Sequence, residues 1–98
     1  MTRSRRVRTP VTDALRIVRS GGAEGVSTMD VGMAVRMGAR KTECVLSALR
    51  DVGLVRVTIT PRPGWVACPP VPDEAKALSD AAWAARGRLR RHAIEATR

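Results

Sequence analysis

The sequence predicts a mainly α-helical domain with a small β-hairpin and a long C-terminal helix. Apolar residues recur at helical spacing in three segments before residue 53, and strand-like alternation follows at 54–60. From residue 74 onward, only Gly87 interrupts a helical pattern. The 98 residues include no Phe or Tyr and two Trp, and a core so poor in large rings favours packed helices. One domain with an appended element is expected.

The first helix is expected to follow Thr9. Thr9 can cap it, Pro10 suits the first helical position, and Gly21-Gly22 ends it. One face carries the apolar residues Val11, Ala14, Leu15 and Val18. This face is predicted to enter the core.

The second helix is expected within residues 27–38. Ser27 and Asp30 have the spacing of a capping box. Met33, Ala34 and Met37 are predicted to form its buried face, and Gly38 to provide the tight turn into the next helix.

The third helix is expected from 40 to 52. Its inward positions follow the i, i+3, i+4, i+7 pattern, and they are Thr42, Val45, Leu46 and Leu49. Gly53 is expected to stop the helix in the left-handed conformation that is common after helix ends.

A hairpin is predicted to follow this helix directly. Val55, Val57 and Ile59 alternate with polar residues, which is the period of a strand. The segment 61–64 is a turn, and the returning strand contains Trp65, which is expected to pack behind the hairpin.

The final helix carries a seam of small residues with alternating steps of three and four, namely Ala75, Leu78, Ala82, Ala85, Leu89, His92 and Ala96. Five of these positions are predicted to pair with a second copy in a homodimer: Leu78, Ala82, Ala85, Leu89 and His92. The alternative is that the helix folds back on its own domain, with Trp83 and Ile94 filling the core. The arginines within 86–91 disfavour a parallel pair unless they splay outward toward phosphates.

The net charge is +9, and the basic residues are 16 Arg and 2 Lys. Four Arg lie in residues 1–8, five lie in 86–98, and residues 36–62 are also locally basic. The Arg fork fits phosphates and guanine edges, so nucleic acid is the first expected partner, ahead of membranes. The bland interpretation is that this charge only keeps the protein dispersed in water.

The segments "MAVRMGARKT" (33–42) and "LSALRDVGLVRV" (46–57) carry a resemblance to a known family. Residues 11–68 resemble the winged helix-turn-helix domain of bacterial transcriptional regulators, of the multiple-antibiotic-resistance, arsenical-resistance and phenolic-acid-repressor types. The resemblance implies a basic arm at 1–8, a DNA-binding domain at 9–70 and a dimerisation element at 71–98. It also implies that the third helix enters the major groove of double-stranded DNA while the hairpin, or wing, contacts the backbone or minor groove.

With its apolar face inward, the third helix is expected to expose a ridge of Arg40, Cys44, Ser47 and Asp51. Lys41, Glu43 and Arg50 flank this ridge. Arg40 is placed to bind guanine, Glu43 to accept from a cytosine amine, and Ser47 to let the helix approach closely. A solvated polar face is the alternative for the same pattern.

Two further segments are candidate DNA contacts. Arg62, between two prolines, is expected to reach a phosphate or the minor groove, or else to be an incidental turn residue. The arm residues Arg3, Arg5 and Arg6 are expected to follow a minor groove or to act as a charged tail that raises salt sensitivity.

Other function classes are weaker. Cys44 beside Arg40 and Lys41 has the setting of a redox sensor, but a small neutral residue at the DNA is the simpler interpretation. Cys44, Cys68 and His92 lack zinc-site spacing, and we expect no metal, no cofactor and no catalytic site. A repressor in the cytoplasm is predicted, with a mobile-element accessory factor, an RNA-binding protein and a protein adaptor as alternatives. No apolar run of membrane-spanning length occurs in the sequence.

Overall fold

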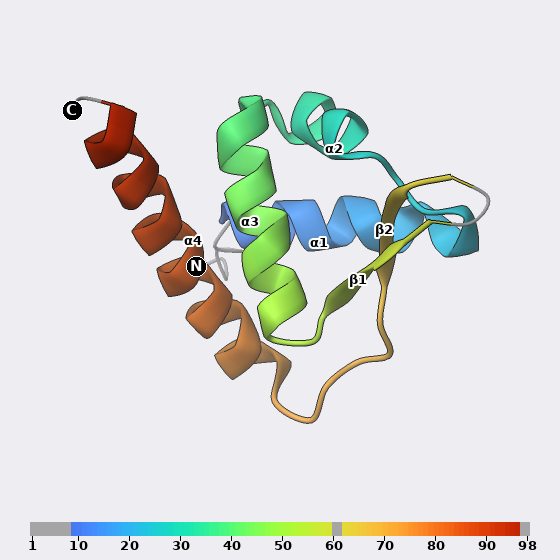
Figure 1. The fold of residues 1–98 in the computed structure, drawn as a ribbon. Coiled ribbons are helices and arrows are strands. Elements are labelled where there is room, and N and C mark those ends of the chain that lie inside the picture. The colour runs from blue at the N-terminus through green and yellow to red at the C-terminus, as the bar shows by residue number, and fades with distance from the viewer. Residues whose placement is uncertain (1–8, 60–61, 97–98) are drawn as a thin grey trace, which may run out of the picture.

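The structure is a computed structural model that describes residues 9–59 and 62–96. The predicted arm at 1–8, with Arg3, Arg5 and Arg6, lies outside the described residues. Helices α1 (Pro10–Ser20), α2 (Thr28–Val35) and α3 (Ala39–Asp51) precede the hairpin of β1 (Val55–Thr58) and β2 (Gly64–Ala67). The chain ends in the long helix α4 (Glu74–Ala96), and a short 3-10 turn, Gly22–Glu24, follows α1. The prediction of a mainly helical chain with a hairpin and a long last helix is confirmed (Figure 1).

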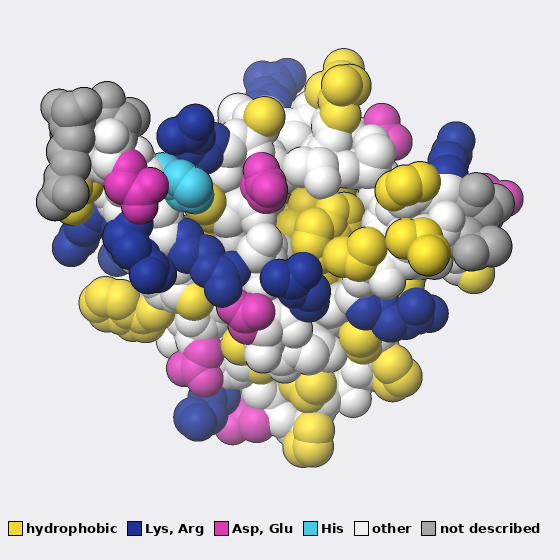
Figure 2. Space-filling view, viewed as in Figure 1, with side chains coloured by type: hydrophobic (Ala, Val, Ile, Leu, Met, Phe, Trp, Pro, Cys, Tyr) yellow, Lys and Arg dark blue, Asp and Glu magenta, His cyan; other side chains and the backbone are white. Residues whose placement is uncertain are grey.

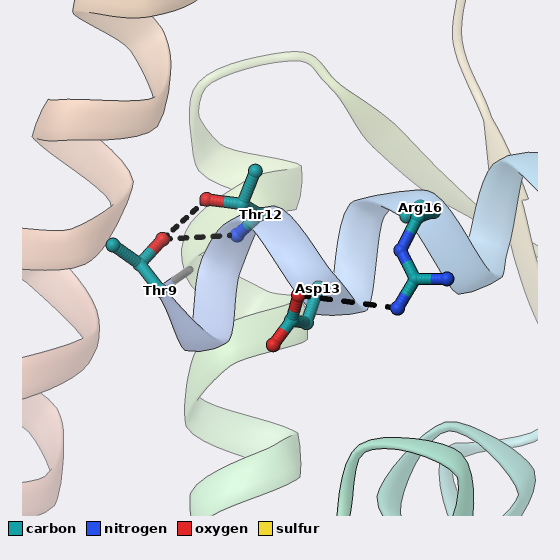
Figure 3. Close-up of polar contacts among 4 residues, drawn as sticks. All are labelled: Thr9, Thr12, Asp13 and Arg16. Atoms are coloured by element: carbon teal, nitrogen blue, oxygen red, sulfur yellow. Dashed lines mark hydrogen bonds and ion pairs between the residues drawn. The ribbon is translucent and has the colours of Figure 1, made fainter. Parts of the chain in front are cut away.

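Helix α1 begins as the sequence predicts. The Thr9 hydroxyl accepts a hydrogen bond from the backbone N–H of Thr12 at 3.2 Å, and Pro10 occupies the first turn (Figure 3). Such a cap satisfies one of the donors that a helix start leaves open. One turn on, Asp13 and Arg16 approach to 3.9 Å. The predicted inner face of this helix is buried: Val11, Ala14, Leu15 and Val18.

Helix α2 is capped by Ser27, whose hydroxyl accepts from the N–H of Asp30 at 3.0 Å. Its predicted buried face is right only at Met37, which packs partly buried against the core, because Met33 is 73% exposed and Ala34 is exposed as well. Val31 and Gly32 are buried instead. A Cβ on Gly32 would lie 2.9 Å from the hydroxyl oxygen of Thr42, so α2 and α3 meet at a glycine without interlocked side chains.

The turn between α2 and α3 depends on a different residue from the one predicted. Arg36 adopts the left-handed conformation with φ 56°, and it ends α2. Gly38 is extended, with φ −66°, and caps the start of α3. A left-handed conformation is uncommon for a residue with a side chain, so the turn stores strain at Arg36.

The inner face and the end of α3 match the sequence prediction. Thr42, Val45, Leu46 and Leu49 are all buried. Gly53 has φ 81°, and the N–H of Leu54 donates to the carbonyl of Leu49 at 3.0 Å. This is the Schellman arrangement, in which the chain reverses directly after the helix.

The hairpin is anchored to the rest of the chain through Trp65. Strand β2 pairs with β1 from Val55–Ala67 to Thr58–Gly64, and Trp65 also forms a bridge with Val26 on its other side. The Trp65 indole N–H donates to the hydroxyl of Thr28 at 2.9 Å, and the ring is 9% exposed, so its predicted packing behind the hairpin is confirmed.

The apolar residues that alternate from Val55 to Ile59 do not form a continuous buried face. Val55 is 1% exposed, but Val57 and Ile59 are 44% and 76% exposed. Among the three alternating residues Val55, Val57 and Ile59, only Val55 belongs to the buried core.

Helix α4 folds back along α3, running antiparallel to it, and also touches α1 (Figure 1). Ala81 and Ala85 are buried in the core, and Leu78 and Ala82 pack partly against it. Three of the positions predicted to pair with a second copy, Leu78, Ala82 and Ala85, therefore contact their own domain.

The residues predicted to mediate fold-back are on the other side of α4. Trp83 is 71% exposed and Ile94 is 51% exposed. Two ion pairs hold α4 in place, Arg19–Glu74 at its start and Asp51–Arg88 near its middle. In the described part of the chain, no helix has the length and apolarity needed to cross a bilayer.

Candidate nucleic-acid interface

Helix α4 determines which residues of α3 face outward. It covers the side of α3 that carries Cys44 and Ala48, which are 4% and 0% exposed. The outward ridge consequently consists of positions separated by steps of three, four and three: Arg40, Glu43, Ser47 and Arg50. Three of these side chains are exposed and Ser47 is half-buried.

Two residues of the predicted ridge are displaced from it. Cys44 is buried beneath α4, so the prediction that it lies on the outward ridge is wrong. Asp51 is exposed, but its carboxylate accepts a hydrogen bond from the Arg88 guanidinium of α4. Glu43 and Arg50, predicted as flanking residues, take their places on the ridge.

Lys41 lies on the other side of α3. It is exposed and lines a cavity of about 250 Å³ between α3, α4 and the start of α1, together with Arg86 and Leu89. Cys44 lines both this cavity and the groove beside the ridge. Lys41 is therefore separated from Arg50 by the strip of α3 that α4 covers.

A groove of about 310 Å³ runs between the ridge of α3 and the C-terminal half of α4. It is lined by Arg40, Glu43, Cys44, Ser47 and Arg50 from α3, and by Arg88 and His92 from α4. His92 was predicted to lie in a dimer seam, and the structure brings it to the ridge instead. Two helices distant in sequence thus contribute to one basic surface.

Cationic side chains gather in a band across the face that α3 and α4 present (Figure 2). Arg36 is exposed in the turn just before α3, and Arg91 is exposed beside Arg88 and His92. The sequence-based site omitted Arg36, Arg88 and Arg91. The charge run at 86–91 was the available signal, but only the packing of α4 shows which helix it joins.

Arg62 is exposed just before β2 begins. Arg56, on β1, is exposed as well and pairs in register with Val66. The hairpin lies at the opposite side of α3 from α4 (Figure 1), so the elements on both sides of α3 carry exposed arginines.

The shifted pKa values lie outside this surface. The hydrogen bond from Arg19 lowers the pKa of Glu74 and, reciprocally, raises that of Arg19. This pair joins the end of α1 to the start of α4. Among the described residues, no group of three or more His, Cys, Asp or Glu side chains is arranged to hold a metal ion.

Comparison of the chain with protein-family models, curated proteins and solved structures gave no match. The candidate interface is therefore argued only from the residues and geometry described above.

Proposed function

We propose that the chain is a winged helix-turn-helix protein that binds double-stranded DNA in a sequence-specific manner. In this proposal α3 enters the major groove and the hairpin contacts the backbone or minor groove. The observation that carries it is the polar ridge of α3, Arg40, Glu43, Ser47 and Arg50, which stands open between two arginine-bearing flanks.

The chemistry of the ridge suits base edges. A major groove about 12 Å wide admits one α-helix, and the Arg fork matches the O6 and N7 acceptors of guanine. Glu43 accepts from a cytosine amine, and Ser47 is short enough to keep the helix close to the bases. Because Glu43 repels phosphates, a ridge that contains it suits contact with particular base pairs better than general attraction to the DNA backbone.

The flanking arginines suit the phosphates. Arg36 precedes α3, Arg88 and Arg91 lie on α4, and Arg62 lies on the hairpin. Contacts of this kind fix orientation and make affinity fall steeply with salt, whatever the base sequence. A strained left-handed Arg36 at the entrance of α3 is consistent with such a role, since strain tends to concentrate at functional sites.

The biological role that fits best is transcriptional repression in the cytoplasm by a protein that occupies its operator. A DNA-binding accessory factor of a mobile element uses the same surface. The arrangement of target sites separates the two roles, because a single pseudo-palindrome favours a repressor and an array of tandem repeats favours the accessory factor.

The proposal is tested by incubating the purified protein with fragmented DNA from its own source at two salt concentrations and sequencing what is retained. Arg40→Ala is compared with Arg16→Ala, which removes the same charge from an exposed position on α1. We expect discrete fragments to survive the higher salt with the wild type and with Arg16→Ala, and to be lost with Arg40→Ala.

Uniform binding that vanishes with salt for all three proteins contradicts the proposal. In that case only general charge attraction acts, and RNA binding or an adaptor role becomes the better account of this surface.

A further inference from the structure

Helix α4 has a second seam, on the side opposite to Ala81 and Ala85. Its positions follow steps of four and three, and they are Lys76, Asp80, Trp83, Gly87, Arg90 and Ile94. All six are exposed. This outer seam is distinct from the inner one that packs on the core.

Two features of the outer seam lack an explanation within one chain. Trp83 is 71% exposed, and its ring contacts the Arg86 guanidinium, 5.8 Å from the ring centroid. Gly87 sits in the middle of a continuous helix, where glycine is unfavourable relative to alanine. A Cβ at Gly87 would meet nothing within 4 Å, so no packing inside this chain requires a glycine there.

Charge is unevenly distributed along the same helix. Glu74 and Asp80 lie in its first half with Lys76, whereas Arg86, Arg88, Arg90 and Arg91 outnumber Glu95 in its second half. A parallel pair of such helices aligns like charges, and an antiparallel pair aligns opposite ones.

We propose that the outer seam of α4 binds the outer seam of a second copy of this chain, antiparallel, to form a two-fold homodimer. When Trp83 of one copy packs over Gly87 of the other, Asp80 of the first faces Arg90 of the second. The same register places the aliphatic stem of Lys76 against Ile94. Two-fold symmetry repeats each contact, so two large rings occupy two glycine positions and two ion pairs flank them.

This dimer has a consequence that rests on the proposed function. The order across it is α3, α4, α4, α3, and steps of roughly 8–10 Å between helix axes separate the two α3 helices by roughly 24–30 Å. That distance is close to the ~34 Å between successive major grooves on one side of DNA. The ridge of α3 lies about a quarter-turn from its α4-covered side, so the two-fold axis turns both ridges to one face.

A single-stranded nucleic acid is the competing occupant, because an exposed Trp beside Arg resembles a base-stacking surface. The second copy fits better for two reasons. Asp80 repels a phosphate backbone, and a stacking surface does not account for Gly87.

The test is the mass of the full chain in solution, measured by sedimentation equilibrium without nucleic acid. We expect twice the 10.6 kDa of one chain at micromolar concentrations and above. Trp83→Ala should raise the dimer dissociation constant at least about tenfold. Met33→Ala, a matched loss of an exposed apolar side chain on α2, should leave it unchanged.

A charge exchange tests the register. Asp80→Arg and Arg90→Asp should each weaken the dimer, and the double variant should recover it. Circular dichroism confirms that each variant is folded. A wild type that stays at 10.6 kDa overturns the dimer, with tryptophan quenching by single-stranded RNA then identifying the alternative occupant. A double variant no stronger than the singles overturns the antiparallel register. Neither result depends on binding to duplex DNA.

Discussion

Helices α3 and α4 lie side by side, yet their sequences predicted their environments with very different success. The inner face of α3 carries Leu46 and Leu49, both fully buried as expected. On α4 the alanines are buried while Trp83 is exposed. A helix with one stripe of large aliphatic residues can bury only that stripe, whereas a helix with alanine on several sides can pack any of those sides against the core. Side-chain size, in addition to spacing, decides how far a periodic pattern can be interpreted.

The largest expected effect is on the free energy of unfolding, which a substitution inside α3 should lower far more than one on the outer side of α4. Leu49→Ala removes a side chain with no exposed surface and should lower the free energy of unfolding by about 3 kcal/mol. Trp83→Ala, although it deletes a larger group, should change it by less than about 0.5 kcal/mol in the monomer. Urea unfolding at low protein concentration measures both. Equal losses would mean that α4 buries its outer side.

The next comparison concerns two glycines at the α2–α3 junction. Gly32→Ala drives a methyl group into Thr42 and should cost about 1–3 kcal/mol. Gly38→Ser places its side chain in open space at the start of α3 and should be neutral or stabilising by a few tenths of a kcal/mol, since Ser is a better cap. Thermal unfolding of both variants tests this, and a harmless Gly32→Ala would show that the helices do not meet at that glycine.

Arg36→Gly should have opposite effects on stability and on binding. Glycine accepts the left-handed conformation at φ 56° without a steric penalty, so the variant should be more stable by about 1 kcal/mol. Under the proposed function it also removes a phosphate contact, so the dependence of affinity on salt should become shallower by about one charge. Calorimetry and a salt series give the two readings, and a loss of stability contradicts the strain at this turn.

The smallest effect concerns the ion pair that joins α1 to α4. Hydrogen bonding to Arg19 lowers the pKa of Glu74 in the folded state, so the pair stabilises the fold above the ordinary Glu value of about 4.3. That stabilisation fades as the pH falls through the lowered pKa. Both side chains are more than a third exposed, so Glu74→Gln should cost less than about 1 kcal/mol near neutral pH.

The Glu74→Gln difference should disappear in acid. Glu24→Gln, which removes a carboxylate from an exposed turn, serves as the matched control. A Glu74→Gln difference that grows as the pH falls would contradict the sign of the shift.

The sequence predictions that the structure confirms depend on local interactions. The Thr9 cap, the left-handed Gly53 and the inner face of α3 each follow from a few neighbouring residues. Tertiary packing decided the rest. The docking of α4 buried Cys44 and rotated the outward ridge toward Glu43 and Arg50, and no local pattern in α3 contains that information.

The proposed function assigns base recognition to one side of α3. Arg50→Ala and Lys41→Ala remove the same charge from the same helix, on the ridge and on the far flank of the strip that α4 covers. We would measure the affinity of each for a retained DNA fragment and for a scrambled fragment of equal length. We expect Arg50→Ala to lose discrimination between the two fragments and Lys41→Ala to weaken binding to both alike. Retained discrimination in Arg50→Ala, with its loss in Lys41→Ala, would contradict the ridge.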